Sequence, residues 1–130
     1  MFRTDKSSNG AAIKIAFTQI EDEDDIIEKL SQVLRISADR IFILTMEVIQ
    51  VTHEGSFVTN IMNERQYEYE IAVGPDSEDD QVSPKELLDE FIDSKSQRDD
   101  LEEFLPSFIE TYTMSTREII PTVPEFRDGK

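Results

Sequence analysis

The sequence predicts an α+β domain in which a four-stranded antiparallel sheet carries two main helices on one face. Two observations lead to this prediction. Several stretches alternate apolar and polar residues, which is typical of half-buried strands, and two others repeat apolar residues at helical spacing. The stretches follow one another in the order strand, helix, strand, strand, helix, strand. A chain of 130 residues has the size of a single domain and can bury a core without metals or disulfides.

The first strand and the first helix are predicted from the N-terminal third. Ile13, Ile15 and Phe17 alternate with polar or small residues, so this stretch predicts a half-buried strand. The acidic run "EDEDD" suits a helix N-terminus, because carboxylates interact favourably with the positive end of the helix dipole. Apolar residues then recur at helical spacing, which predicts an amphipathic helix over residues 23–35.

Two further strands are predicted in the middle of the chain. Residues 40–52, "RIFILTMEVIQVT", are rich in β-branched and apolar side chains, which predicts a long central strand with both faces partly covered. In "RQYEYEIAV", Tyr67 and Tyr69 alternate with Glu68 and Glu70. This alternation predicts a strand with one buried face and one acidic, hydrated face.

The clearest local signal is "SPKE" at residues 83–86. Ser83 can cap a helix, Pro84 fits the first helical position, and Glu86 completes a capping box. A break follows at "DSKSQRDD", and a short second helix is predicted to end before Pro106. The stretch "FIETYTMSTREII" is again rich in β-branched and aromatic residues and predicts the last strand.

This order of elements is that of the ferredoxin-like split β-α-β-β-α-β fold, with both helices on one sheet face. The domain is predicted to cover residues 11–120. Residues 1–10 are interpreted as a disordered or added N-terminal segment, and residues 121–130 as an extended tail. The other sheet face has little cover in this sequence, so a binding surface is expected there.

The chain is strongly acidic, with 29 Asp and Glu against 13 Lys and Arg and a formal net charge of -16. This charge disfavours nucleic-acid binding and anionic membranes, which require a basic surface. It favours a basic protein partner, solubility or cations. The absence of cysteine excludes disulfides and cysteine catalysis, and a single histidine excludes a multi-histidine metal site.

The sequence leaves the cellular location open. No apolar run is long enough to span a membrane, and the N-terminus lacks the apolar region of a signal peptide. Either the protein is cytosolic, or the chain is a segment of a longer one. The sequence contains no Asn-X-Ser/Thr glycosylation site, which argues mildly against an extracellular location.

The stretch "VTHEGSFVTN" places Gly55 and Ser56 between the second and third predicted strands. Glycine is a common turn residue because it tolerates positive φ, and an ordinary turn is the first interpretation. In a strained loop the Ser56 hydroxyl could instead attack the Gly55 carbonyl, and water would then release the ester. His53 could assist as a base, although a histidine near a turn is usually only solvated.

With Gly55, Ser56, Phe57 and Val58 in this loop, the chain resembles the SEA domain family. The segment "LRISADRIFIL" is also similar to the connection between helix and strand in related adhesion-protein modules. SEA domains are membrane-proximal extracellular modules of mucins and adhesion receptors with a ferredoxin-like fold, and many cleave themselves between Gly and Ser. The resemblance implies this topology over residues 11–120 and membership of a longer membrane protein.

The sequence departs from the SEA pattern in two ways. Thr59 follows Val58, where the family favours another aliphatic residue, and residues 59–66, "TNIMNERQ", predict a longer connection to the next strand. Slack in this connection would relieve the strain that drives the acyl shift. The chain is therefore expected to stay intact, with Gly55 as a turn or bulge residue.

Other candidate sites each have a simpler interpretation. Two acidic clusters could bind calcium through oxygen ligands, but neither has the spacing of an EF-hand, so solvated surfaces are preferred and no metal or cofactor is expected. The clusters are Asp22, Asp24 and Asp25, and Asp76, Glu78, Asp79 and Asp80. Glu68 and Glu70 could act as paired catalytic carboxylates, or form a hydrated sheet face. Tyr67 and Tyr69 could anchor a partner, or fill the core.

Two functions of different classes are compatible with these observations. The first is a non-enzymatic extracellular or lumenal interaction module of an adhesion-type membrane protein, suggested by the topology and the Gly-Ser step. The second is a small cytosolic acidic protein that binds and neutralises a basic partner, such as an immunity protein or a nucleic-acid mimic, suggested by the net charge. An enzyme is not expected, because the sequence has no phosphate loop, nucleotide-binding motif or supported Ser-His-Asp set.

Overall fold

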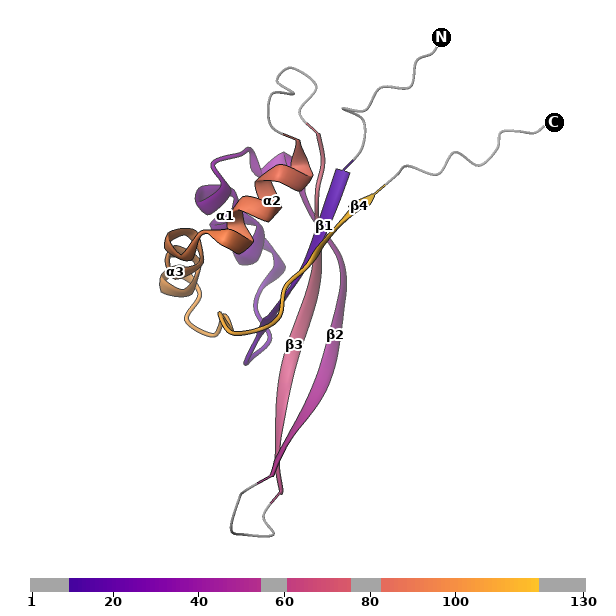
Figure 1. The fold of residues 1–130 in the computed structure, drawn as a ribbon, viewed down its shortest axis with the longest axis vertical. Coiled ribbons are helices and arrows are strands. Elements are labelled where there is room, and N and C mark those ends of the chain that lie inside the picture. Colours follow the sequence, from indigo (N-terminus) through magenta and orange to yellow (C-terminus); the bar gives the residue numbers. More distant parts are fainter. Residues whose placement is uncertain (1–9, 55–60, 76–82, 120–130) are drawn as a thin grey trace, which may run out of the picture.

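The computed structural model describes residues 10–54, 61–75 and 83–119. Figure 1 shows these residues as one sheet with helices packed against it. In chain order the elements are β1 (Gly10–Phe17), α1 (Glu23–Leu34), the short 3-10 helix η2 (Ala38–Arg40), β2 (Ile41–Glu54), β3 (Ile61–Val73), α2 (Pro84–Asp93), α3 (Lys95–Phe104) and β4 (Thr116–Ile119).

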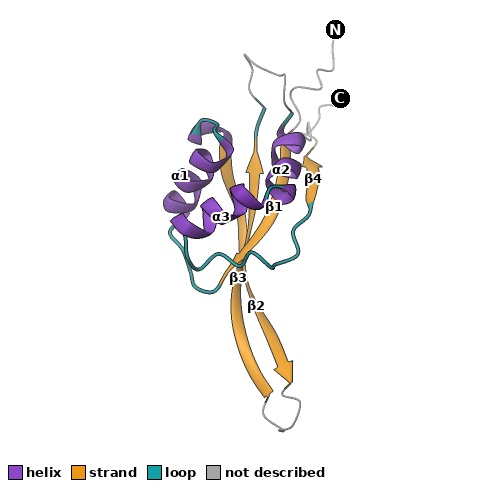
Figure 2. Cartoon of the chain, turned by 60° about the vertical axis from the view of Figure 1, so that its left-hand side comes forward, coloured by secondary structure: helices purple, strands orange, loops and turns teal. Residues whose placement is uncertain are grey.

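The four strands form one antiparallel sheet in the order β2-β3-β1-β4. Strand β3 therefore lies between β1 and β2, which are joined in the chain through α1. All three helices lie on one face of the sheet (Figures 1 and 2). The predicted α+β fold with a four-stranded antiparallel sheet is confirmed, and the more specific ferredoxin-like assignment stays a prediction.

The core lies between the sheet and the helices. Its largest fully buried side chains come from β1, β3 and the three α-helices, including Phe17, Ile71, Phe91 and Leu101. Tyr69 is 1% exposed, and its ring lies 5.5 Å from the ring of Phe17, edge to face. Burial raises the pKa of the Tyr69 hydroxyl above its usual value.

Tyr69 also fixes the entry to α1. Its hydroxyl donates to the carbonyl of Glu21 and accepts from the Glu21 amide, each at 3.0 Å. The Ser107 hydroxyl donates to the Glu21 carboxylate. These bonds tie the loop before α1 both to β3 and to the segment after α3, so the helical layer is held in place from two sides.

The helix boundaries follow local signals in the sequence. Asp22 caps α1 by accepting the Asp24 amide at 2.8 Å, and the helix ends at Arg35, which adopts a left-handed conformation at φ 62°. Ser83 and Glu86 form the predicted capping box of α2, with bonds of 3.2 and 3.0 Å. The break predicted over residues 93–100 is confined to Ser94, because α3 already begins at Lys95. None of these described helices is long and apolar enough to cross a membrane.

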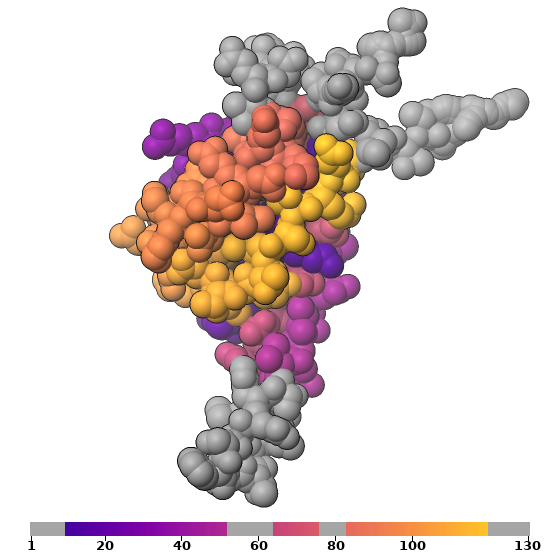
Figure 3. Space-filling view, in the orientation of Figure 1, coloured from indigo at the N-terminus to yellow at the C-terminus, as the bar shows by residue number. Residues whose placement is uncertain are grey.

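The β2–β3 hairpin extends beyond the rest of the sheet as an arm. The last residue of β1, Phe17, pairs with Tyr67 of β3, which pairs on its other side with Val48 of β2. Beyond this point residues 49–54 and 61–66 pair only with each other among the described residues. The arm projects away from the helices (Figures 1 and 2), and the space-filling view shows the body narrowing into it (Figure 3).

Two sequence-based predictions about this hairpin are wrong. Residues 59–66 do not form a long connection, because β3 begins at Ile61, directly opposite Glu54. Strand β2 is not central, because it lies at the edge of the sheet. The apolar run that suggested a central strand is explained partly by burial of Ile41 and Ile43 beneath the helices, and otherwise by apolar side chains that remain exposed.

Candidate functional site

The exposed edge of β2 is the most unusual surface of the described residues. Four large apolar side chains of this strand remain exposed: Phe42 at 53%, Leu44 at 44%, Met46 at 38% and Val48 at 55%. Scattered exposed apolar residues are normal, but here they follow one another along a single strand. Ile20 and Phe104 are comparably exposed large apolar residues outside β2.

The register of the hairpin shows why these side chains are uncovered. Met46 and Val48 lie opposite Tyr69 and Tyr67, so they point to the helix side of the sheet. Tyr69 is covered by the body of the domain, whereas Met46 and Val48 lie one strand further out. Leu44 falls in a register shift between Ile43 and Thr45, where a bulge interrupts the regular pairing.

Strand β2 is also nearly free of charge. Between Ile41 and Val51, Glu47 is the single ionisable side chain. The whole chain has a formal net charge of -16, so this strip differs in electrostatic character from the surface around it. An uncharged apolar strip on an acidic protein suits an uncharged apolar partner better than a basic one.

The sheet face away from the helices carries two ion pairs. Arg117 contacts the Glu70 carboxylate through Nη2 at 2.7 Å and Nε at 3.0 Å, and Lys14 lies 3.9 Å from Glu68. The side chains of Glu68 and Glu70 are only 11% and 12% exposed. The prediction of a hydrated acidic face is therefore wrong, because neighbouring strands cover these carboxylates and supply cations to them.

A hollow of about 390 Å³ lies on this face beside the Arg117–Glu70 pair. Its floor includes Ala12, whose small side chain leaves space between the longer ones of Lys14 and Arg117. Glu68 and Glu70 both have a cation beside them, and nothing in the pairing singles out one as an acid and the other as a base. This arrangement stabilises the sheet face and gives no sign of paired acid–base chemistry.

The two tyrosines predicted as binding candidates lie on the helix side. Tyr69 belongs to the core, with its hydroxyl held by Glu21, so it is not available to a partner. Tyr67 is partly buried and packs against the core at the base of the arm. The exposed apolar side chains on this side are instead Met46 and Val48 of β2, whereas Phe42 pairs with Ala72 and lies on the opposite sheet face.

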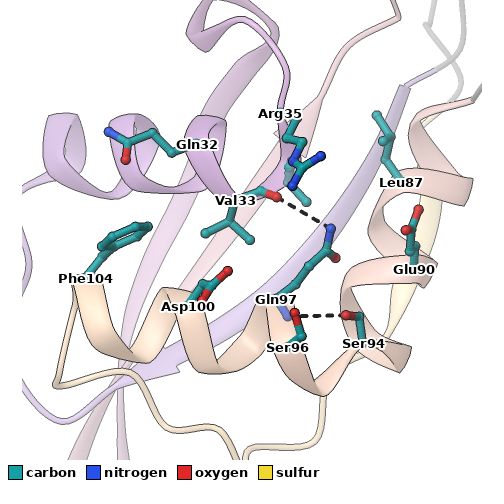
Figure 4. A pocket seen from close by; sticks show the side chains of 11 residues that line it. Gln32, Val33, Arg35, Leu87, Glu90, Ser94, Ser96, Gln97, Asp100 and Phe104 are labelled. Carbon is teal, nitrogen blue, oxygen red and sulfur yellow. Dashed lines mark hydrogen bonds between the residues drawn. The ribbon is translucent and has the colours of Figure 1, made fainter.

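A second hollow, of about 560 Å³, lies between the helices. Figure 4 shows Gln97 of α3 between the end of α1 and the side of α2, with its amide directed at the Val33 carbonyl at a donor–acceptor distance of 3.5 Å. Glu90 and Asp100 line the hollow from α2 and α3, and Arg35 lies at the end of α1. Because the lining carries both acidic and basic side chains, it does not indicate one type of ligand.

Acidic residues that cluster in the described part of the chain have structural partners. Carboxylate oxygens of Asp99, Glu102 and Glu110 lie within 4.8 Å of one another. Lys95 contacts Asp99 at 3.1 Å and Glu110 at 3.3 Å, so the group is part of an ion-pair network. Asp22 caps α1, which gives that cluster a structural role.

Several predicted site residues lie outside the described residues. They are Gly55, Ser56, Asp76, Glu78, Asp79 and Asp80.

The exposure of Phe42, Leu44, Met46 and Val48 on β2 was not predicted from the sequence, because an apolar strand usually indicates burial. The near absence of charge between Ile41 and Val51, in an otherwise acidic chain, was a signal that could have identified this strand. Comparison with known protein families and with curated proteins finds no match to this chain.

Proposed function

We propose that this chain is a non-enzymatic protein-interaction module that binds through the free edge of β2. The single observation that carries the proposal is the run of exposed apolar side chains along a 14-residue edge strand. Long apolar edges promote unwanted pairing, and natural proteins usually shorten, charge or cover them. A partner that adds a strand to this edge would satisfy its backbone groups and cover its apolar side chains.

The wider context of this proposal follows the resemblance to SEA domains. In that context the module belongs to a larger adhesion-type membrane protein, on its extracellular or lumenal side. The order of the elements supports this assignment, as does the position of Gly55 and Ser56, which directly follow the last paired residue of β2, Glu54. A full-length native product that ends near Lys130 and lacks a membrane anchor would contradict it.

Self-cleavage between Gly55 and Ser56 is a separate question, and we expect the chain to be intact. The connection between β2 and β3 is shorter than predicted, since only residues 55–60 separate Glu54 from Ile61. The expectation of an intact chain therefore depends on Thr59, where self-cleaving SEA domains favour an aliphatic residue. Intact-mass measurement of freshly folded protein should give one species, whereas two fragments that disappear in Ser56→Ala would contradict the prediction.

The interaction surface can be tested with a short extended peptide. A labelled ten-residue peptide with alternating Val and Thr offers an uncharged strand with one apolar face. Fluorescence anisotropy should show binding to the wild-type protein and at least about tenfold weaker binding to Val48→Lys, because a buried lysine loses its hydration. Ile20→Lys is the matched control, since Ile20 is 61% exposed and lies outside the sheet edge. Equal binding by both variants would contradict the proposed surface.

A second candidate function is supported by the helical layer, which concentrates acidic side chains. The first turn of α1 carries Glu23, Asp24 and Asp25, and α3 exposes Asp99, Asp100, Glu102 and Glu103. This surface suits a cytosolic protein that neutralises a basic partner. Affinity for a cationic peptide should then fall steeply between low and high salt, because exposed charges are screened. Binding that is insensitive to salt would eliminate this candidate.

A further inference from the structure

The arm of the β2–β3 hairpin lacks a third strand. Residues 49–54 and 61–66 pair only with each other among the described residues, beyond the end of β1 (Figure 2). Two-stranded ribbons are marginally stable in water, and three or more strands are normally needed for independent stability. A strand placed along the outer edge of β2 would therefore complete the arm and add cover beside the exposed Met46 and Val48.

The charge distribution indicates what kind of strand this would be. Glu47 is the single charged residue between Ile41 and Val51, so a strongly basic strand would find little to pair with along this edge. An acidic strand would be repelled by the rest of the chain, whose net charge is -16. The complementary strand is thus long, apolar and nearly uncharged, and β2 itself has these properties.

We propose that a second copy of this chain is the partner, with the two β2 strands paired antiparallel across a two-fold axis. This inference rests on the proposed function and specifies its partner. Regular pairing beyond the bulge begins at Thr45, and the midpoint of the residues from Thr45 to Val51 is Val48. With the axis at Val48, the two Val48 side chains face each other on the helix side of the sheet.

The same register places compatible residues opposite one another. Met46 lies opposite Gln50 of the second copy, and Glu47 lies opposite Ile49 instead of the other Glu47, which avoids a direct repulsion between carboxylates. Each arm then lies along the body of the other copy, so residues 49–54 acquire a neighbouring strand on their free side. A two-fold axis perpendicular to the sheet keeps the helices of both copies on one face of a joined sheet.

The net charge opposes this association and makes it dependent on salt. Two copies each carrying a charge of -16 repel each other over distances that salt screens, since the screening length falls from about 30 Å at 0.01 M to about 10 Å at 0.1 M. The dimer should therefore become tighter as salt rises. A complex with a basic partner would respond in the opposite direction.

Sedimentation velocity over a range of protein concentrations tests the stoichiometry. The wild-type protein should form dimers, more of them at 0.5 M than at 0.05 M NaCl. Val48→Lys should shift the dissociation constant at least about tenfold toward monomer, because two lysines would meet at the axis. The control Ile20→Lys makes the same chemical change at a side chain with 61% exposure outside the edge, and it should leave the constant unchanged. Equal weakening by both variants would contradict the proposed interface.

Cysteine cross-linking tests the register, because the chain contains no cysteine of its own. Under mild oxidation Val48→Cys should form a disulfide-linked dimer, since directly opposite residues in an antiparallel pair bring their Cβ atoms close together. Ile20→Cys, whose β2 edge is unchanged, should form no disulfide-linked dimer at the same protein concentration. Rapid cross-linking of Met46→Cys without cross-linking of Val48→Cys would overturn the register.

The outcomes separate this inference from the proposed function. A wild-type protein that stays monomeric at every salt concentration overturns the pairing of two copies. If that monomer still binds the Val-Thr peptide and loses it in Val48→Lys, the β2 edge binds a different strand and the proposed function stands. If neither dimer nor peptide complex forms, both the inference and the proposed function are wrong.

Discussion

The two edges of the sheet are built in opposite ways. Strand β2 has 14 residues, exposes four large apolar side chains and carries one charge between Ile41 and Val51, whereas β4 has four residues, two of which are the charged Arg117 and Glu118. Short length and charge are the usual means by which proteins prevent edges from pairing with other chains. Among the described residues, the β4 edge has both of these protective features and the β2 edge lacks both.

The β4 edge is also fixed to the body by side chains. The Thr116 hydroxyl donates to the Asp89 carboxylate at 2.6 Å, and Arg117 binds Glu70 on the other sheet face. The remainder of β1 is completed by residues 107–109, which exchange backbone bonds of 2.8 and 3.0 Å with Thr18 and Ala16. On this side, β1 is therefore paired with β4 near its start and with residues 107–109 near its end.

The largest expected difference between the two sides concerns stability. Phe17 is fully buried, with aromatic neighbours at 5.5 and 6.0 Å, so Phe17→Ala should destabilise the fold by about 3–5 kcal/mol. Val48→Ala removes an exposed side chain and should change stability by less than about 0.5 kcal/mol in dilute protein. Urea unfolding measures both. A large cost at Val48 in the monomer would mean that the β2 edge is already covered within the chain.

A smaller effect is expected at the attachment of β4. Hydrogen bonds from Lys85 and Thr116 lower the pKa of Asp89 below its usual value. Because the folded-state pKa is the lower one, Asp89 stabilises the fold above pH 3.8, the ordinary value, and this contribution is lost as the pH falls through the folded-state pKa. Asp89→Asn should cost about 1 kcal/mol at pH 7, with the exposure of the pair taken into account.

Urea midpoints measured from pH 7 down to pH 2.5 check this prediction. The difference between the wild-type protein and Asp89→Asn should shrink at the acid end. Glu103→Gln is a control that removes a carboxylate from the exposed surface of α3. A difference that stays constant across this range would show that the Asp89 carboxylate charge does not help to hold β4.

The smallest effect is expected from removing one charge of β4. Glu118 is exposed, and surface substitutions usually change stability by less than about 0.5 kcal/mol, so Glu118→Val should fold almost as stably as the wild type. Arg117 is left in place because its partner Glu70 is only 12% exposed. It should not gain a new dimer interface, because four residues offer too few backbone bonds. Sedimentation of this variant combined with Val48→Lys tests this directly. New association would show that charge, more than length, protects this edge.

The elements that the sequence predicted well depend on local chemistry. Ser83 and Asp22 cap the helices that follow them, and the apolar spacing behind each cap sets the buried face. Both signals lie within one or two turns of the helix they define. The alternation of Tyr67 and Tyr69 with Glu68 and Glu70 likewise predicted correctly which side chains of β3 point toward the core.

The features that the sequence did not predict depend on pairing between distant segments. An apolar run such as Ile41–Val51 is compatible with a central or an edge position, and the pairing of β3 with β1 decides between them. Residues 61–66 lack a strand pattern, and their strand structure comes from β2 opposite them. The cations beside Glu68 and Glu70 come from β1 and β4, so no local pattern could indicate them.

The shortness of β4 limits how far an assembly of this protein can grow. If both edges of a sheet accepted strands, each added copy would expose a new edge, and association would continue into a fibre. Here a dimer formed through β2 presents only two copies of β4 at its ends, each with four residues and two charges. In the proposed dimer, the short and charged β4 would offer no long edge to a further copy, so association would stop at two chains.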